Sequence, residues 1–463
     1  MSKYITLLIV LFTSSFSFSQ KEDSLFIRLI YDEVLSNGEC YGNLEYLCKE
    51  IGARLSGSPQ AALAINWGEQ TLKDLKLDKV YRQEILVPVW KRGQRERANI
   101  MDSYLVGNKP MNIKALGGSI GTPPKGITAE VVIVESIEEL STRPEADFSG
   151  KIVLFNRPMD AKLIDTFSAY GGCVDQRWAG AKEAVKYGAV AVLVRSLTHN
   201  VDEHAHTGVM DYGDYGQKIP AAAVSTDDAN AMNQIVKKEG KCTVNLSLSC
   251  ASLPDAVSYN VIGEITGNEK PDSVIIIGGH LDSWDVGEGA HDDGAGIVHC
   301  IEAMRLIKES GYKPRFTIRC VLFMNEENGN RGGNKYAEEA ATKKEYQYFA
   351  LESDRGGFSP RGFSIDATLE EDVYKIQSWS GLLNPYGLHL YKKGYAGVDI
   401  KPIKEKQDTV TMCGFIPDSQ RYFDYHHSDK DVFETVNKRE LELGAASIAS
   451  MVYLVDKYGW ESR

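Results

Sequence analysis

Apolar runs of strand length and helical periodicity alternate in the carboxyl-terminal half of the chain. Ile297, Ile301, Met304 and Ile307 recur at the spacing of an amphipathic helix. Three continuous apolar runs are typical of strands that are covered on both faces: 273–278, 316–324 and 346–351. Strands and a helix in this order, with short connections, predict an α/β sheet domain over residues 255–463.

Shorter apolar runs mark residues 117–254. We expect one helix and four short strands there: the helix at 178–187 and the strands at 131–134, 152–155, 190–194 and 221–224. Glycine and proline crowd residues 117–124, which favours a domain boundary at that point. These residues predict a second, smaller domain at 117–254. Amphipathic stretches in residues 20–116 predict that this segment packs on the sheet domain as its amino-terminal part.

The first 19 residues have the three parts of an export signal. Lys3 is positively charged, residues 5–12 are apolar, and residues 17–19 form a small-x-small cleavage site. The alternative is a buried first strand. A membrane-spanning helix needs about 20 apolar residues, and neither this run nor a later one is long enough. We therefore predict a cleaved signal peptide at 1–19, no membrane span, and an exported protein that is periplasmic or secreted.

Composition is that of an ordinary globular protein. The chain has 463 residues, 43% of them hydrophobic, and a formal net charge of −12. An acidic chain without a run of Lys and Arg is repelled by a polyanion, so we expect no nucleic-acid partner.

The chain has 8 cysteines, which an exported protein can pair into disulfides. Cys40 and Cys48 are close enough in sequence to close a small loop, as are Cys242 and Cys250. The connectivity cannot be deduced from sequence. We expect a mixture of buried thiols and structural bridges.

His280 and Asp282 stand where the first apolar run of the sheet domain ends. Open α/β sheets place their ligand sites at the carboxyl ends of strands, so His280 is well placed for function. One such pair means little by itself. Asp282, however, is placed to accept the second N–H of a metal-bound imidazole.

Three further segments place imidazole or carboxylate groups at strand or loop ends. Asp292 and Asp293 lie in a glycine-rich loop that precedes a predicted helix. The alternative is that they only cap the amino terminus of that helix. The remaining groups close two strands and one loop: Glu326 with Glu327, Asp354, and His426 with His427. Coincidence is a weaker explanation of this set than a common site.

The ordered set HLD, DDGAG, NEE, ESD and HHS resembles the exported co-catalytic dizinc aminopeptidases and carboxypeptidases, most closely their carboxypeptidase Q (plasma glutamate carboxypeptidase) branch. The resemblance covers nearly the whole mature chain. It implies an α/β, mixed-sheet zinc exopeptidase domain with helices on both faces. It also implies that residues 117–254 are an inserted protease-associated (PA) domain, and it suggests a homodimer.

The resemblance implies two Zn²⁺ ions per chain. His280 and Asp354 would bind one ion, Glu327 and His427 the other, and Asp292 would bridge them. Imidazole and carboxylate are both ligands that zinc accepts, and a catalytic zinc keeps a position open for water.

The same resemblance implies the catalytic roles. Glu326 would be the general base for a metal-bridged hydroxide, and Asp282 would orient His280. His426 would hydrogen-bond the tetrahedral oxyanion, or else be a structural histidine. Asp293 after Asp292 resembles the strained peptide link found at this point in the family.

The leading hypothesis, as the resemblance implies, is an exported dizinc exopeptidase that hydrolyses dipeptides or short peptides. One alternative is a non-catalytic receptor or scaffold, which should have lost metal ligands. Another is a dizinc hydrolase of a different acyl substrate, such as an aminoacylase or a glutaminyl cyclase, because a shared fold does not determine the substrate. In the smaller domain, His199, His204 and His206 have no carboxylate at motif spacing, so we expect an ordinary exposed loop there.

Overall fold

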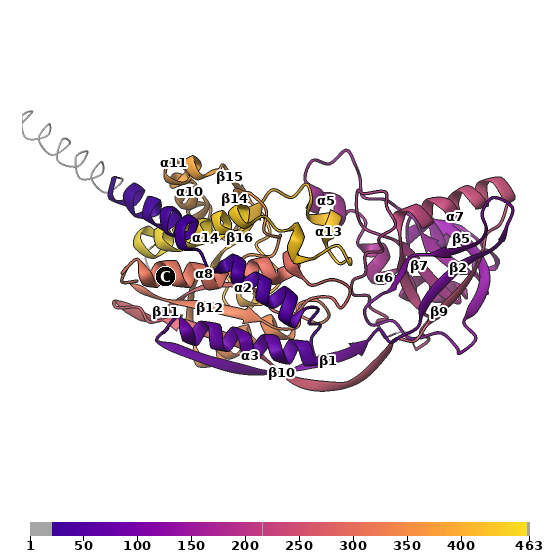
Figure 1. Cartoon of the computed structure of the whole chain (residues 1–463), viewed down its shortest axis with the longest axis horizontal. Coiled ribbons are helices and arrows are strands. Elements are labelled where there is room, and N and C mark those ends of the chain that lie inside the picture. Colours follow the sequence, from indigo (N-terminus) through magenta and orange to yellow (C-terminus); the bar gives the residue numbers. More distant parts are fainter. Residues whose placement is uncertain (1–20, 215, 461–463) are drawn as a thin grey trace, which may run out of the picture.

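Two mixed β-sheets lie along the long axis of the computed structural model, which describes residues 21–214 and 216–460 (Figure 1). The long strands β1 and β10 pair antiparallel from Lys79 with Glu264 to Lys91 with Ala251, and they connect the two sheets. The predicted export signal, residues 1–19, lies outside the described residues.

The first sheet has the strand order β1-β10-β12-β11-β13-β16-β14-β15. Its strands are β1 (Lys79–Lys91), β10 (Ala251–Ile265), β11 (Lys270–His280), β12 (Phe316–Phe323), β13 (Tyr346–Glu352), β14 (Pro360–Asp366), β15 (Leu390–Lys393) and β16 (Thr411–Pro417). The central neighbours β12, β11, β13 and β16 are parallel, and every residue of β12 is buried. The three apolar runs expected to be buried strands are therefore β11, β12 and β13.

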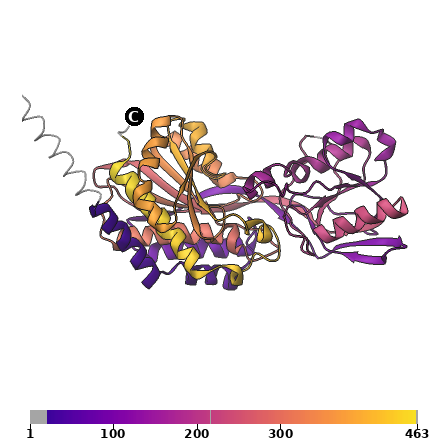
Figure 2. The same cartoon turned by 90° about the horizontal axis from the view of Figure 1, so that it is seen from above.

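Helices cover both faces of this sheet, as Figure 2 shows from above. On β11, Ile275 and Ile277 point to the face of α3 (Pro59–Asp74), α8 (Ala295–Glu309) and α14 (Lys438–Tyr458). Val274 and Ile276 point to the face of α9 (Arg331–Lys343) and α12 (Lys401–Lys406). The other helices of this main domain span residues 21–37, α2 (Cys40–Tyr46), α10 (Glu370–Ser378), α11 (Ser380–Leu383) and α13 (Tyr422–Tyr425).

The second sheet has the order β3-β2-β9-β5-β6-β7-β8-β4. Its strands are β2 (Glu96–Ser103), β3 (Gly107–Met111), β4 (Ile113–Ala115), β5 (Ile127–Val134), β6 (Ile152–Phe155), β7 (Ala191–Arg195), β8 (Ala221–Val224) and β9 (Thr243–Leu248). On opposite faces lie α6 (Asp175–Ala184) and α7 (Thr226–Glu239), and the short helices are α4 (Glu138–Thr142) and α5 (Thr166–Gly171).

The boundary expected at residue 117 is wrong. Strands β2 to β4, residues 96–115, are hydrogen-bonded into the second sheet and not into the first. The chain leaves the first sheet on β1 and returns on its partner β10, so the whole intervening segment belongs to the smaller domain, residues 96–248. The glycines and prolines near residue 117 mark a loop inside that domain.

All 8 cysteines are buried free thiols, so the expected structural bridges are absent. Cys242 and Cys250 flank the extended strand β9, whose 6 residues span roughly 20 Å at about 3.4 Å per residue. Cys40 and Cys48 are held apart by the helical backbone between them, at about 1.5 Å per residue. Both separations exceed the roughly 7 Å that a disulfide allows between Cα atoms.

The described part of the chain contains no helix that is long and apolar enough to cross a membrane.

Candidate functional site

Three neighbouring parallel strands deliver the first group of site residues. His280 is the last residue of β11, Glu326 and Glu327 follow β12, and Asp354 follows β13. Because β12, β11 and β13 are parallel neighbours, their carboxyl ends meet at one edge of the sheet. His280 Nε2 lies 3.6 Å from Asp354 Oδ1.

Asp292 lies in the turn Ala290–Gly294 before α8. The backbone N–H groups of His291 and Asp292 donate to the Asp431 carboxylate at 2.7 and 3.1 Å, which fixes this turn. The Asp292–Asp293 peptide bond is cis. Asp293 Oδ1 accepts from the Gly296 N–H at 3.0 Å, so the capping function is present as well.

The Asp292 carboxylate lies between two imidazoles. Its Oδ1 is 3.2 Å from His280 Nε2, and its Oδ2 is 3.2 Å from His427 Nε2. On the far side, His427 Nε2 lies 3.2 Å from Glu327 Oε2. The five residues expected to bind metal are therefore brought together, with Asp292 in the central position.

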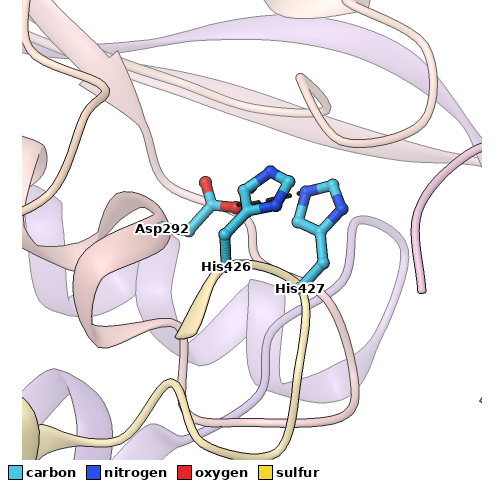
Figure 3. A group of neighbouring side chains, drawn as sticks. All are labelled: Asp292, His426 and His427. Carbon is cyan, nitrogen blue, oxygen red and sulfur yellow. Dashed lines mark ion pairs between the residues drawn. The ribbon is translucent and has the colours of Figure 1, made fainter. Parts of the chain in front are cut away.

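His426 lies within the same group. Its ring stacks on that of His427 with 3.5 Å between centroids, and its Nε2 is 3.6 Å from Asp292 Oδ2. Figure 3 shows both imidazoles rising from one loop beside the Asp292 carboxylate. Burial, together with the neighbouring His427, holds the pKa of His426 well below its usual range, so its ring is neutral.

The Asp282 carboxylate has a different partner from the one expected. His280 Nδ1 is 2.9 Å from the Asp282 backbone carbonyl and 3.9 Å from its carboxylate. The carboxylate instead accepts the backbone N–H groups of Asn325 and Glu326 at 2.7 and 3.1 Å. The main chain at Asp282 thus orients the imidazole, while its side chain holds the loop that carries Glu326.

Crowded buried carboxylates give the site its electrostatics. Burial raises the pKa of Glu326 well above its usual range, and burial together with Asp292 raises the pKa of Glu327 to about 7. Burial opposes ionisation of Asp292, but His280 and His427 hold its pKa well below normal. Cations in the site would offset the repulsion between these neighbouring carboxylates.

The donor set fits divalent metal ions. Asp292 Oδ2 and Asp354 Oδ1 are buried and make no hydrogen bond, which is typical of ligand atoms that face a common ion. Two groups of possible ligands share Asp292: His280 with Asp354, and His426 with His427. Nitrogen and oxygen donors of this kind suit zinc.

A cavity of about 650 Å³ opens beside these residues. Glu326, Asp354 and His426 line it from the main domain. The opposite wall comes from the smaller domain, which contributes residues that sequence reasoning missed: Tyr170, Arg177 and Trp178. Their one sequence signal is a cluster of aromatic and basic residues near the expected helix at 178–187.

The histidine segment of the smaller domain packs directly against the loop of His426 and His427. His206 is 2% exposed, and its Nδ1 lies 2.7 Å from the His426 carbonyl oxygen. The Thr207 N–H donates to the His427 carbonyl at 2.9 Å, and the Thr207 carbonyl lies 3.3 Å from His427 Nδ1. The expectation of an ordinary exposed loop is therefore wrong. His206 and Thr207 contact backbone carbonyls of the opposing loop, and His204 Nδ1 lies 2.6 Å from the Asp429 carboxylate of that loop.

Comparison with known proteins identifies the family. The chain matches the model of peptidase family M28 over residues 260–452. Carboxypeptidase Q of Bos taurus is 36% identical over 416 residues, which cover 90% of this chain and 84% of the relative. Carboxypeptidase Q of Homo sapiens is 35% identical over 415 residues, again 90% of this chain and 84% of the relative.

Solved structures agree. A peptidase M28 precursor from Shewanella amazonensis is 32% identical and superposes with a TM-score of 0.90, covering 96% of this chain and 99% of that one. A zinc aminopeptidase from Bacillus subtilis, 20% identical, has the same fold with a TM-score of 0.64 over 91% of this chain and 96% of its own. The chain belongs to peptidase family M28, as a metallo-exopeptidase related to carboxypeptidase Q.

Proposed function

We propose that this enzyme holds two zinc ions and hydrolyses dipeptides or short peptides. His280 and Asp354 would hold one ion, Glu327 and His427 the other, and Asp292 both. The observation that carries the proposal is the position of Asp292, whose two oxygens each lie 3.2 Å from a different imidazole. Buried carboxylates that are crowded together without cations destabilise a fold. A scaffold without catalysis would gain nothing from keeping this arrangement.

Zinc at this site would lower the pKa of a water molecule and polarise the scissile carbonyl. Glu327 directs its Oε2 to His427 Nε2 at 3.2 Å, whereas Glu326 lines the cavity without such a contact, so we assign Glu326 the proton transfer. It would take the proton of the attacking water and pass it to the leaving amine. Asp282, through its bond to the Glu326 N–H, keeps the base in place.

His426 would stabilise the oxyanion. It lines the cavity beside Asp292, and its neutral ring carries one N–H that is available for donation. A donor aimed at the developing negative charge stabilises the transition state more than the bound substrate.

The cavity suits a small substrate. Its volume of about 650 Å³ lies within the usual range of small-ligand sites, and the smaller domain forms one wall. We interpret that domain as a protease-associated domain, and we infer export from residues 1–19. A dizinc hydrolase of another acyl substrate is the competing function, and substrate assays separate the two.

The test compares Glu326→Gln with Glu327→Gln, two adjacent and chemically alike residues to which we assign different work. Glu326→Gln should lower kcat on an unblocked dipeptide by about 10²–10⁴-fold at unchanged zinc content, because glutamine cannot accept the water's proton. Glu327→Gln should instead lose zinc. Both variants are loaded identically, and zinc is measured by elemental analysis.

Two outcomes would contradict this assignment. If Glu326→Gln loses zinc while Glu327→Gln keeps two ions, the base and the ligand are reversed. If the wild type binds less than one ion per chain in excess zinc, or cleaves no dipeptide, the proposed function fails.

A further inference from the structure

The hairpin turn between β2 and β3 presents three consecutive apolar side chains to solvent. Tyr104 is 95% exposed, Leu105 47% and Val106 40%. Across the described residues, no other run of three consecutive large apolar residues is exposed. Single exposed apolar residues are normal on a protein surface, whereas a contiguous group marks a contact with another molecule. We call residues 104–106 the apolar tip.

The composition of this turn is unusual for its position. β2 ends at Ser103 and β3 begins at Gly107, and these two residues pair across the turn. Short turns are dominated by Gly, Pro, Asn, Asp and Ser, because these residues favour the turn backbone or hydrogen-bond to it. The apolar tip contains none of them, and its side chains belong to neither apolar core of the smaller domain. Folding of the domain therefore does not explain the apolar tip, whereas an apolar partner outside the chain would.

The backbone of the apolar tip already has hydrogen-bond partners within the protein. The Leu105 N–H donates to Ser103 Oγ at 3.1 Å and to the Glu239 carboxylate at 3.0 Å. The Val106 N–H donates to Ser103 Oγ at 3.3 Å. An unpaired N–H is costly in an apolar medium. These two donors stay paired when the apolar tip leaves water, so the turn is suited to enter an apolar layer.

Three exposed lysines lie beside the apolar tip. Lys237 and Lys238 are in the last turn of α7, and Lys241 follows that helix. Glu239, which lies between them in sequence, accepts hydrogen bonds from the turn and so brings this segment next to it. Within the described part of the chain, none of the three lysines forms an ion pair. Their charges are therefore available to a partner.

The local charge is opposite to that of the whole chain. The chain has a formal net charge of −12, but in this region the three lysines outnumber the acidic residues Asp102 and Glu239. The main domain lies at the other end of the long axis (Figure 1). Salt screens charges that are separated by more than a Debye length of about 8 Å. An anion at the apolar tip is therefore exposed mainly to the lysines.

Apolar side chains beside unpaired lysines match an anionic lipid surface. Proteins that bind a membrane at its surface bury apolar side chains at the boundary of headgroups and acyl chains, while lysines attract anionic headgroups. A hairpin turn that projects from a domain is convex, whereas a small ligand needs a concave site. The shape and the charge of the apolar tip thus favour a fluid, negatively charged layer.

We propose that the apolar tip docks this protein on an anionic phospholipid membrane surface. The apolar tip enters the interfacial layer, and the three lysines contact the phosphate groups. Helices α5 and α6 lie next to the main domain, and α7 lies beyond them (Figure 1). Docking at the end of α7 therefore leaves the cavity beside α5 and α6 open to solution. The inference goes beyond the proposed peptidase function and does not depend on it.

The experiment measures co-sedimentation of the mature chain, which begins at Gln20, with phospholipid vesicles. Residues 1–19 are left out because an apolar signal segment would bind lipid by itself. We expect binding to vesicles of phosphatidylglycerol and phosphatidylcholine at about 0.1 M salt. Binding should be roughly tenfold weaker to phosphatidylcholine alone, and also to the mixed vesicles at about 0.5 M salt.

The first variant removes the apolar side chains. Tyr104→Ser, Leu105→Ser and Val106→Ser together should lower the partition coefficient by about 10²-fold, because each substitution withdraws more than one CH₂ group from the interface. The matched control is Leu163→Ser with Ile164→Ser, a pair of consecutive exposed apolar residues elsewhere in the same domain. The control should bind vesicles like the wild type.

The second variant removes the charges. Lys237→Gln, Lys238→Gln and Lys241→Gln together should abolish the preference for anionic vesicles and weaken binding by about 10²-fold, at roughly fivefold for each lysine. The matched control replaces three lysines of α12 in the main domain by glutamine: Lys401, Lys404 and Lys406. It changes the net charge by the same amount and should leave binding unchanged. Circular dichroism verifies that each variant is folded.

Three results would overturn the proposal. The first is a wild type that does not sediment with anionic vesicles, and the second is a variant of the apolar tip or of its lysines that binds as tightly as the wild type. The third is a wild type that ignores vesicles but self-associates through the apolar tip in sedimentation equilibrium, which would assign this surface to a second copy of the chain. Dipeptide hydrolysis in solution is measured separately, so the peptidase function is tested independently of docking.

Discussion

The two halves of the proposed metal site are built in different ways. His280 is the last residue of one buried strand and Asp354 follows its parallel neighbour, so the hydrogen-bond register of a single sheet sets their positions. His427 lies on a loop after the short helix α13, with a left-handed φ of 60°, which is uncommon for a residue other than glycine. Its carbonyl and its Nδ1 both meet Thr207 of the smaller domain.

This difference gives the smaller domain two tasks at the site. It forms a wall of the cavity, and it also supplies the carbonyl that faces the outer nitrogen of His427. Groups behind a metal ligand orient the imidazole and raise its basicity. The half formed by His280 and Asp354 therefore depends on a single sheet. The other half takes Glu327 from that sheet, but its His427 depends on the contact between two domains.

The largest expected effect comes from the one residue that belongs to both halves. Asp292→Ala should remove a ligand from both ions, whereas His280→Ala and His427→Ala should each weaken one. We expect Asp292→Ala to lose activity by more than the 10–100-fold that is typical of residues behind a ligand, and to hold less zinc than either histidine variant. Elemental analysis after identical loading measures the difference. Equal zinc loss in all three variants would contradict the central position of Asp292.

A smaller effect should follow from disturbing only the domain contact. His206→Ala removes a buried ring that bonds the His426 carbonyl, and we expect about tenfold weaker binding of one zinc ion, with the second ion unaffected. The control is His204→Ala, because the His204 side chain is 33% exposed and its pair with Asp429 should contribute little. A zinc titration followed by calorimetry resolves the two ions. Equal weakening of both ions by His206→Ala would show that the halves are not independent.

The sheet half of the site could be predicted from sequence, because buried parallel strands are continuous apolar runs and ligand residues follow their ends. The contact between the two domains could not be predicted from sequence. His206 and Thr207 meet His426 and His427 only through tertiary packing, and their partners are backbone carbonyls, which have no sequence signature. The role of the Asp282 side chain was also missed. Its carboxylate and its backbone carbonyl both lie near the His280 imidazole, and sequence does not tell which of them accepts the N–H.

The early start of the smaller domain escaped prediction for a related reason. Strands β2 to β4 are short and partly polar, so they lack the apolar run that identified β11. Their place follows from pairing with β9 and β8, which are distant in sequence. The cysteine pairs were misjudged because short sequence separation does not imply short distance along an extended strand or a helix.

The smallest effect on zinc binding is expected from a change in the core beneath the sheet half, where the readout is the pH dependence of stability. His299 on α8 is fully buried, its Nδ1 is 3.1 Å from Ser353 Oγ beside Asp354, and burial lowers its pKa to about 3. Below the unfolded pKa of about 6.5, the unfolded chain takes up a proton that the folded chain refuses, so stability falls as pH falls toward 3. At pH 5 the loss is about 2 kcal/mol for this one group.

His299→Gln should therefore flatten the fall of the unfolding free energy between pH 6.5 and pH 5, although it lowers stability at neutral pH by disturbing a packed site. Urea unfolding at a series of pH values measures the slope, and His389→Gln, at an exposed histidine, is the matched control. The slope is the informative quantity, because a packing defect shifts the whole curve by a constant amount while a lost titration changes its steepness. A slope equal to that of the wild type would show that His299 takes up its proton in the folded state, and that the core beneath the strand ends is more open to water than its burial indicates.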